Sequence, residues 1–261
     1  MKLPLYQVDA FTDKVFRGNP AAVCPLQHWL EDRVLQAIAA ENNLSETAYF
    51  VGAGEQFQIR WFTPALEIDL CGHATLASAF VIFNYFSPEL AVVRFSSKSG
   101  ELKVTRRDQL IWLDFPRREA TPCPAPQQLI EGLGLSPQEI LVARDYLVVY
   151  KNEDEVLQLQ PDFALLKQLD CLGVIVTAPG RKVDFVSRFF APKAGIDEDP
   201  VTGSSHCTLI PYWAKRFGKN LLKAQQLSAR GGELFCEDRS ERVFIGGNAV
   251  CYLEGLISVQ P

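Results

Sequence analysis

The sequence predicts an α+β protein of two pseudo-symmetric lobes, each a curled, mostly antiparallel sheet wrapped around a central helix. The first observation is a repeat, because Arg60–Pro64 and Arg188–Pro192 have similar sequences 128 residues apart. The second is that each copy is followed by a glycine, Gly72 or Gly203, and then by a long apolar run. An apolar run of helix length, without a polar face, is typical of an enclosed helix. Two such lobes would face each other across a cleft, a favoured place for a small-molecule site.

The first half of the chain alternates short apolar strands with two helices. A helix is expected over Asp32–Glu41, where Val34, Leu35 and Ile38 recur at helical spacing. The enclosed helix is expected from Gly72 to Phe86, because nearly every position is apolar. The expected strands, rich in apolar and β-branched residues, are Leu5–Phe11, Ala21–Pro25, a strand after Leu44, Phe57–Thr63, Val92–Ser96, Glu101–Arg106 and Leu110–Phe115.

The second half repeats this plan after a proline-rich stretch. Residues 1–116 form the expected N-terminal lobe, 117–126 the linker and 127–261 the C-terminal lobe, with a last strand that can return to the first lobe. The expected helices are Gln127–Leu133, one around Asp162–Leu169 and an enclosed helix from Ser204 to Phe217 that Pro211 would kink. The expected strands are Leu141–Val149 (more than one), Gly173–Thr177, Asp184–Phe190, Gln226–Arg230, Glu233–Glu237, Arg242–Gly246 and Ala249–Leu256.

Composition excludes several classes of protein. With 48% hydrophobic and 22% charged residues the chain can form a large core. A net charge of -5 disfavours a nucleic-acid partner, and the basic pairs Arg117-Arg118 and Lys215-Arg216 are interpreted as solvated surface. No run is long and apolar enough to span a membrane, and the first residues do not resemble a signal peptide. Seven scattered cysteines, without a Cys-x-x-Cys pair and with only three histidines, argue against zinc and suggest a reducing cytoplasm.

Glu46 is the first candidate for chemistry. It lies in Leu44–Tyr49, between an expected helix and an apolar strand, where a carboxylate is out of place. One interpretation is a solvated glutamate at a helix end. The other is a general base in a partly buried site, because a positioned carboxylate can take a proton from a substrate.

Each enclosed helix has polar candidates at its start. Gly72 would let a ligand approach the backbone N–H groups of the first helix, and His73 could donate to a substrate oxygen or serve as an ordinary capping or core residue. Before the second helix, Asp199 belongs to an acidic turn that is either solvated or placed opposite Glu46. Ser204 would then add an N–H and a hydroxyl, which together suit a substrate carboxylate.

A set of linked motifs resembles the phenazine-biosynthesis isomerase-like family along the whole chain. The motifs are Asp9–Thr12, Arg17–Val23, Leu44–Ala48, Arg60–Pro64, Cys71–Thr75, Phe190–Pro192, Glu198–Ser204, Arg230–Glu233 and Gly246–Val250. This resemblance implies a diaminopimelate-epimerase-like fold, a homodimer and no cofactor. It also implies an isomerase in which one glutamate moves a proton within a conjugated substrate.

The resemblance also implies roles for individual residues. Glu46 matches the catalytic acid/base, with His73 and Asp199 as its supporting catalytic groups. The residues matched to substrate binding are Gly72, Gly203, Ser204 and Asn19. No metal ligand is implied, and the partner is a small carboxylate-bearing molecule.

Racemases and epimerases of the same fold use one cysteine from each lobe, which provides a second hypothesis. This chain has Cys71 before the first glycine but Thr202 before the second. A threonine hydroxyl is a poor base at neutral pH, so two-cysteine racemisation is disfavoured. Epimerisation by Glu46 with Cys71 or another second base stays open, as does a binding protein of this fold that has lost its reaction.

Overall fold

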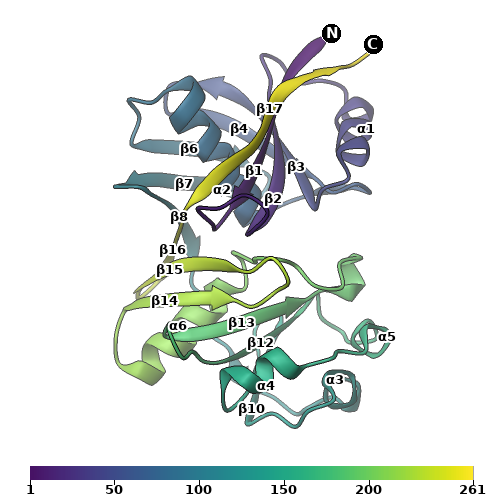
Figure 1. Ribbon diagram of the computed structural model, residues 1–261, viewed down its shortest axis with the longest axis vertical. Coiled ribbons are helices and arrows are strands. Elements are labelled where there is room, and N and C mark those ends of the chain that lie inside the picture. The colour runs from purple at the N-terminus through teal and green to yellow at the C-terminus, as the bar shows by residue number, and fades with distance from the viewer. Residues whose placement is uncertain (261) are drawn as a thin grey trace. The chain divides into compact units, whose positions relative to one another are not determined.

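The structure is a computed structural model, described here for residues 1–260, and it divides the chain into two compact units. Unit 1 contains residues 1–114 and the chain from Gly246 onward, and unit 2 contains Phe115–Ile245. The chain therefore leaves unit 1 in strand β8 (Leu110–Pro116) and returns to it in strand β16 (Arg242–Gly247) (Figure 1).

Unit 1 is built on a single curled sheet. Its strands are β1 (Lys2–Ala10), β2 (Asn19–Pro25), β3 (Glu46–Ala53), β4 (Gln56–Phe62), β5 (Glu67–Ile68), β6 (Val92–Ser97), β7 (Gly100–Arg107), β8 and β17 (Ala249–Ser258). Hydrogen bonds connect them in the order β17-β1-β2-β3-β4-β6-β7-β8, with the short β5 also on β4. The β2–β3 and β4–β6 pairings are parallel and the others antiparallel.

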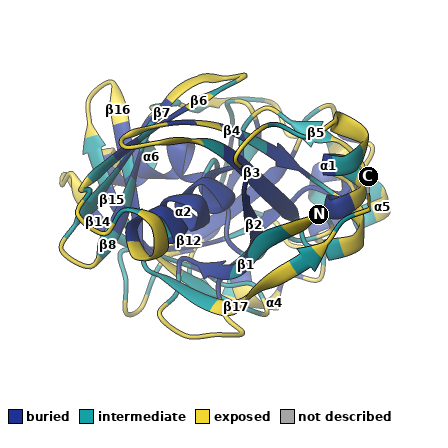
Figure 2. Ribbon diagram, turned by 90° about the horizontal axis from the view of Figure 1, so that it is seen from above, coloured by how far each residue is buried: buried dark blue, intermediate teal, exposed yellow. Residues whose placement is uncertain are grey.

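Two helices complete unit 1. Helix α2 (Gly72–Val81) contacts β1, β2 and β3, and almost all of its side chains are buried, as the dark blue ribbon in Figure 2 shows. The last five residues of the expected helix, Ile82–Phe86, form a π-helical turn, η1. Helix α1 (Asp32–Asn42) lies on another part of the sheet, where Leu35 and Ile38 pack with Tyr49. The sheet therefore wraps α2, as the apolar run predicts.

Unit 2 repeats this arrangement of strands. Its strands are β9 (Thr121–Pro122), β10 (Glu139–Val142), β11 (Tyr146–Val149), β12 (Val174–Pro179), β13 (Phe185–Phe190), β14 (Leu221–Gln226), β15 (Gly232–Arg239) and the start of β16. From β10 to β15 the pairings are antiparallel, parallel, antiparallel, parallel and antiparallel. The pairings from β1 to β7 follow the same sequence of directions. The repeat in the sequence is thus a repeat of sheet topology.

The helices of unit 2 pack against its sheet through apolar side chains. Helix α6 (His206–Phe217) contacts β14 and β15. The short helices α3 (Gln127–Leu133), α4 (Glu153–Gln158) and α5 (Phe163–Leu166) bury Leu129, Val156 and Leu166 in one cluster with β11, β12 and β13. Pro192–Ala194 adds a 3-10 turn, η2.

The domain boundaries agree with one expectation and differ from another. As the sequence allowed, the final segment belongs to unit 1, because β17 pairs along the whole of β1, and Figure 1 shows these two strands and the chain ends side by side. The stretch 117–126, expected to be only a linker, contributes β9, which pairs with β10. It is therefore part of the unit 2 sheet rather than a free connection.

Several expected elements are wrong in detail. The strand expected over Gln226–Arg230 does not exist: β14 ends at Gln226, and Ser228 closes a turn by accepting a hydrogen bond from Gly231 N–H through its hydroxyl. The last helix begins at His206 rather than Ser204, because His206 N–H donates to the carbonyl of Gly203 in a tighter preceding turn. Helix α4 was not expected. Its side-chain cap is Asn152, which accepts from Glu155 N–H at 3.0 Å.

Pro211 lies inside α6, which stays continuous across it. Proline has no N–H, so the carbonyl four residues earlier, that of Cys207, loses its partner in the helix. Arg118 supplies the replacement, since its backbone N–H donates to Cys207 O at 3.0 Å. An N–H from the chain segment that follows β8 thus completes the hydrogen bonding of α6.

None of the helices within residues 1–260 has both the length and the apolarity needed to cross a lipid bilayer. All seven cysteines are free thiols.

Candidate active site

Three of the predicted site residues meet in unit 1. Asn19 and Glu46 are the first residues of the parallel strands β2 and β3, so both lie at the same end of the sheet. His73 lies in the first turn of α2, directly after Gly72. All three side chains are buried. The parallel pairing and the enclosed helix therefore bring together residues that are 54 positions apart in the sequence.

His73 is the centre of this group. Its Nε2 lies 3.1 Å from Glu46 Oε2, and apart from this contact neither atom has a hydrogen-bond partner among residues 1–260. Its Nδ1 lies 3.2 Å from the side-chain amide Nδ2 of Asn19. When that amide donates to Nδ1, the ring proton is on Nε2 and faces the carboxylate. Asn19, predicted to bind substrate, is therefore placed to fix the histidine tautomer.

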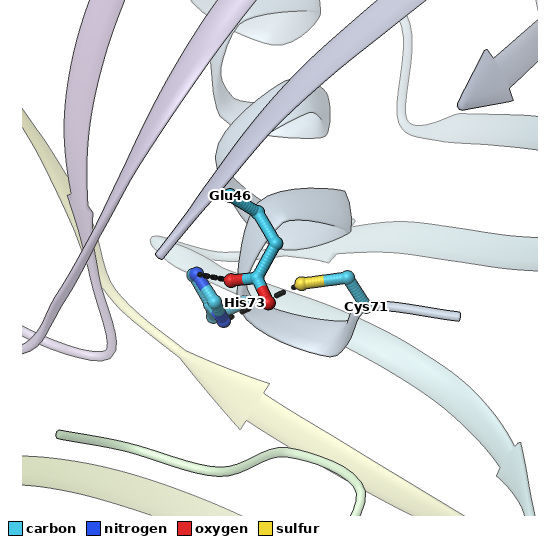
Figure 3. A group of neighbouring side chains, drawn as sticks. All are labelled: Glu46, Cys71 and His73. Atoms are coloured by element: carbon cyan, nitrogen blue, oxygen red, sulfur yellow. Dashed lines mark hydrogen bonds and ion pairs between the residues drawn. The ribbon is translucent and has the colours of Figure 1, made fainter. Parts of the chain in front are cut away.

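Cys71 is the fourth member of the group, and Figure 3 shows it beside Glu46 and His73. Its Sγ lies 3.5 Å from Nδ1 of His73. Burial, with a smaller contribution from Glu46, raises the pKa of Cys71 to about 11. The side chain is therefore a neutral thiol at neutral pH, a possible proton donor and not a ready base.

The charge on His73 depends on its buried surroundings. Burial lowers the pKa of the ring, and the neighbouring Glu46 carboxylate raises it. With its proton on Nε2, the His73 ring donates to the Glu46 carboxylate, and the two buried side chains form a compact acid/base pair. Such a pair can exchange a proton with a third group placed next to it.

Glu46, Cys71 and His73 also form a group of possible metal ligands, with one ligand atom from each lying within 4.8 Å of the others. The closest contacts, however, use different ring nitrogens: Glu46 faces Nε2 and Cys71 faces Nδ1. One ion cannot replace both contacts, because the two nitrogens point away from each other. The arrangement fits a hydrogen-bonded chain of three side chains better than a metal centre.

The remaining predicted residues lie in unit 2, before α6. Thr202 Oγ1 donates to Asp199 Oδ2 at 2.5 Å. The side chain of Gln226 holds the same turn, because its Oε1 accepts from Thr202 N–H and its Nε2 donates to the carbonyl of Asp199. Gly203 is buried and Ser204 is half-buried. The threonine at the position that corresponds to Cys71 thus serves to orient Asp199.

Sequence reasoning missed Arg144, which contacts Ser204. Arg144 lies in the turn between β10 and β11, and its Nη2 donates to Ser204 Oγ at 3.2 Å. The same guanidinium donates twice to the buried Asp145, at 2.9 and 3.1 Å. An arginine in a turn has no distinctive spacing, so the only available signal was an Arg-Asp pair between two apolar strands.

Sequence reasoning also missed the partners of the repeated arginines. Arg60 donates through Nε and Nη2 to both carboxylate oxygens of Glu67, at 2.7 and 2.8 Å. Arg188 holds Glu198 in the same way, at 2.8 and 2.9 Å. Each glutamate precedes the helix glycine by five residues, a regularity visible in the sequence. We call each arginine–glutamate pair a clamp.

Comparisons with known proteins decide the family. Residues 8–255 match the family described as phenazine biosynthesis-like protein. A protein of Pseudomonas aeruginosa named as an isomerase is 52% identical over 257 residues, which cover 98% of this chain and 99% of that protein. The chain belongs to the phenazine biosynthesis-like family.

Solved structures agree with this assignment. A phenazine biosynthesis protein of the PhzF family from Enterococcus faecalis has a TM-score of 0.97 and 50% identity, and the match covers 99% of this chain and 100% of that one. A probable proline racemase from Agrobacterium radiobacter has a TM-score of 0.66 at 10% identity, which is a likeness of fold alone. The predicted α+β fold and membership of an isomerase family of enzymes are confirmed.

Proposed function

We propose that this phenazine biosynthesis-like protein is a cofactor-independent isomerase in which Glu46 moves a proton within a small carboxylate-bearing substrate. The observation that carries the proposal is the contact of 3.1 Å between Oε2 of Glu46 and Nε2 of His73, two buried side chains. Among residues 1–260, Oε2 of this carboxylate has no other partner, which suits it to proton transfer. This arrangement is costly for stability alone, because burying charge is expensive.

The proposed reaction has two steps. The Glu46 carboxylate takes a proton from a carbon acidified by a neighbouring double bond or carbonyl group, and the electron pair of that C–H bond moves into the conjugated system. The resulting carboxylic acid returns the proton to another carbon of the same molecule. No atom is gained or lost, so no co-reactant is needed. His73 would steady the charge on Glu46 or on the substrate at each step.

The unit 2 residues have supporting roles in this proposal. Asp199 would bind a cationic or hydrogen-bond-donating group of the substrate, and Ser204, with Gly203 before it, would bind a carboxylate. Gly72, in unit 1, would let the substrate approach the start of α2. Asn19 would act on His73 rather than on the substrate, because its amide is 3.2 Å from the ring. We include in the proposal the homodimer and the absence of a cofactor that the family resemblance implies, and the cytoplasmic location that the cysteine usage suggests.

Epimerisation by two bases is the second candidate, because Cys71 is also close to His73. It requires one group to start as a base on each face of a carbon. Cys71, with a pKa raised by burial to about 11, starts as a thiol. Epimerisation would therefore need Glu46 as the base that accepts the proton, with the Cys71 thiol as the donor on the other face.

The test is turnover by the full chain and by Glu46→Gln, followed by NMR in D₂O. The substrates would be a panel of cyclic dienes and β,γ-unsaturated carboxylic acids, with α-amino acids added for epimerisation. Glu46→Gln should lower turnover by roughly 10²–10⁴-fold, because glutamine has no exchangeable proton of suitable acidity. Its fold, measured by circular dichroism, should not change.

Glu41→Gln is the matched control, since Glu41 is an exposed glutamate on α1 in the same unit. It should keep wild-type turnover. Full activity in Glu46→Gln would exclude the proposed mechanism. Deuterium at an inverted α-carbon, without migration of a double bond, would favour the epimerase instead.

A further inference from the structure

The two units place a polar contact at the same point of their shared topology. In unit 1, Asn19, at the start of the second strand, contacts His73, the residue that follows the helix glycine. In unit 2, Arg144, two residues before the corresponding strand β11, contacts Ser204, which follows the other glycine. The unit 1 contact belongs to the proposed acid/base group. The unit 2 contact replaces an amide and an imidazole with a cation and a hydroxyl, so its chemistry is different.

Arg144 is held firmly and still has donors to offer. Its Nε and Nη2 are both used by Asp145, an aspartate that is only 2% exposed. Among residues 1–260, no contact uses its Nη1, and a third of its side chain is exposed. A guanidinium fixed by a buried carboxylate is preorganised, and its free N–H groups can bind an anion without first being ordered.

Two further arginines act on the start of α6. Arg118 is fixed beside the first turn of α6 by its backbone hydrogen bond to Cys207. Burial raises the pKa of Cys207 to about 11, and the charges of Arg118, Arg144 and Arg242 act against that rise. Arg118, Arg144 and Arg242 therefore favour negative charge at the start of α6, although Asp145 offsets part of the charge of Arg144.

We propose that Arg144 and Ser204 form a carboxylate-binding subsite, in which the guanidinium of Arg144 selects an anionic substrate over its neutral analogue. The inference rests on the proposed function, because the anion is taken to be the carboxylate of the isomerase substrate. Nη1 of Arg144 would donate to one carboxylate oxygen and the Ser204 hydroxyl to the other. Arg144 is then a determinant of specificity, and Glu46 remains the residue that performs the chemistry.

Binding of benzoate and of neutral benzamide to the full chain tests this subsite. The variants are Arg144→Gln, Arg144→Lys and Ser204→Ala, with Arg181→Gln as a control that removes an equally charged, exposed arginine of unit 2. Arg144→Gln should weaken benzoate binding by roughly tenfold to a hundredfold and leave benzamide binding unchanged. Arg144→Lys should restore part of the affinity, since it keeps the charge without the fork of donors.

Each outcome decides the matter. Equal benzoate affinity in wild type and Arg144→Gln, or no benzoate binding by the folded wild-type protein, would overturn the subsite. So would an equal loss for benzamide, which would indicate a structural role. Glu46→Gln should bind benzoate normally. If Glu46→Gln also turned over substrate normally while Arg144→Gln lost benzoate, the subsite would stand and the proposed mechanism would fail.

Discussion

In unit 1 the third strand of the repeated sheet begins with Glu46, whereas in unit 2 the corresponding strand, β12, begins with Val174 and follows Gly173. Val174 is buried in an apolar cluster, and the ring of Phe189 occupies the space where a side chain at Gly173 would lie. The same sheet topology thus carries an ionisable group in one copy and a closed apolar contact in the other. Duplicated architecture does not require duplicated chemistry.

The clamps show the opposite behaviour, because both units keep them. In each, the arginine is bidentate to a glutamate and also lies over the phenylalanine two residues later, at 5.1 Å for Arg60 and 4.9 Å for Arg188. The glutamate is followed within five residues by the glycine that precedes His73 or Ser204. The clamp therefore fixes the loop that leads to the site. What the units share is positioning, and what they do not share is the acid/base.

The largest expected effect is the loss of stability when either clamp is removed, and a difference between the two clamps would contradict the comparison. Arg60→Gln and Arg188→Gln should each lower the free energy of unfolding by about 2 kcal/mol, between the values for exposed and buried ion pairs. Chemical denaturation measures this. Arg33→Gln is the control, because Arg33 and Glu31 form an exposed pair. A cost no greater than that of Arg33→Gln in either clamp would show that this clamp is not a shared structural device.

The free energy of unfolding at acidic pH tests the clamp of unit 1 separately. Hydrogen bonding to Arg60 is the main reason that the pKa of Glu67 is lowered from 4.5 to about 2. As the pH falls, Glu67 is protonated in the unfolded chain before it is protonated in the folded protein. Its contribution to the free energy of unfolding is therefore complete above pH 4.5 and is lost as the pH falls toward 2. Glu67→Gln should destabilise the protein at pH 7 and flatten this part of the curve. An unchanged slope between pH 4.5 and 2 would contradict the assignment.

The smallest expected effect concerns Cys71, the residue that differs from Thr202. Cys71→Ser should reduce turnover by less than about tenfold if Glu46 alone carries the proton, because the thiol then only borders His73. Two-base epimerisation predicts a loss as large as that of Glu46→Gln. Steady-state kinetics of both variants on one substrate separates these outcomes, and Cys24→Ser, a buried cysteine elsewhere in unit 1, controls for the substitution itself.

The sequence was sufficient for the parts that rest on periodicity and repetition. The enclosed helix after Gly72 and the paired strands of both units follow from apolar patterns, and the offset between Gly72 and Gly203 predicts their common plan. Glu46 stood out because a carboxylate at the start of an apolar strand conflicts with burial. Its position next to His73 required the parallel pairing of β2 and β3, which no local pattern contains.

The rest of the site could not be predicted, because it depends on contacts between distant turns. Asn19 was assigned to substrate binding, but its contact with His73 Nδ1 depends on a side-chain orientation. Arg144 is ordinary in the sequence and becomes notable only beside Ser204. The strand expected after Gln226 failed for a related reason: a polar run with serine, arginine and two glycines favours a turn over a strand, whatever follows it.

The pairing of β17 with β1 has a consequence for the order of folding during synthesis. Unit 2 is continuous in the chain, so all of its strands have been made once Ile245 is reached. Unit 1 lacks strand β17 until residues 249–258 are made, and their partners on β1 are residues 2–10. Contacts of such long sequence separation form slowly. During translation, unit 2 can therefore be complete before unit 1, and the unit that holds Glu46 must wait until residues 249–258 have been made.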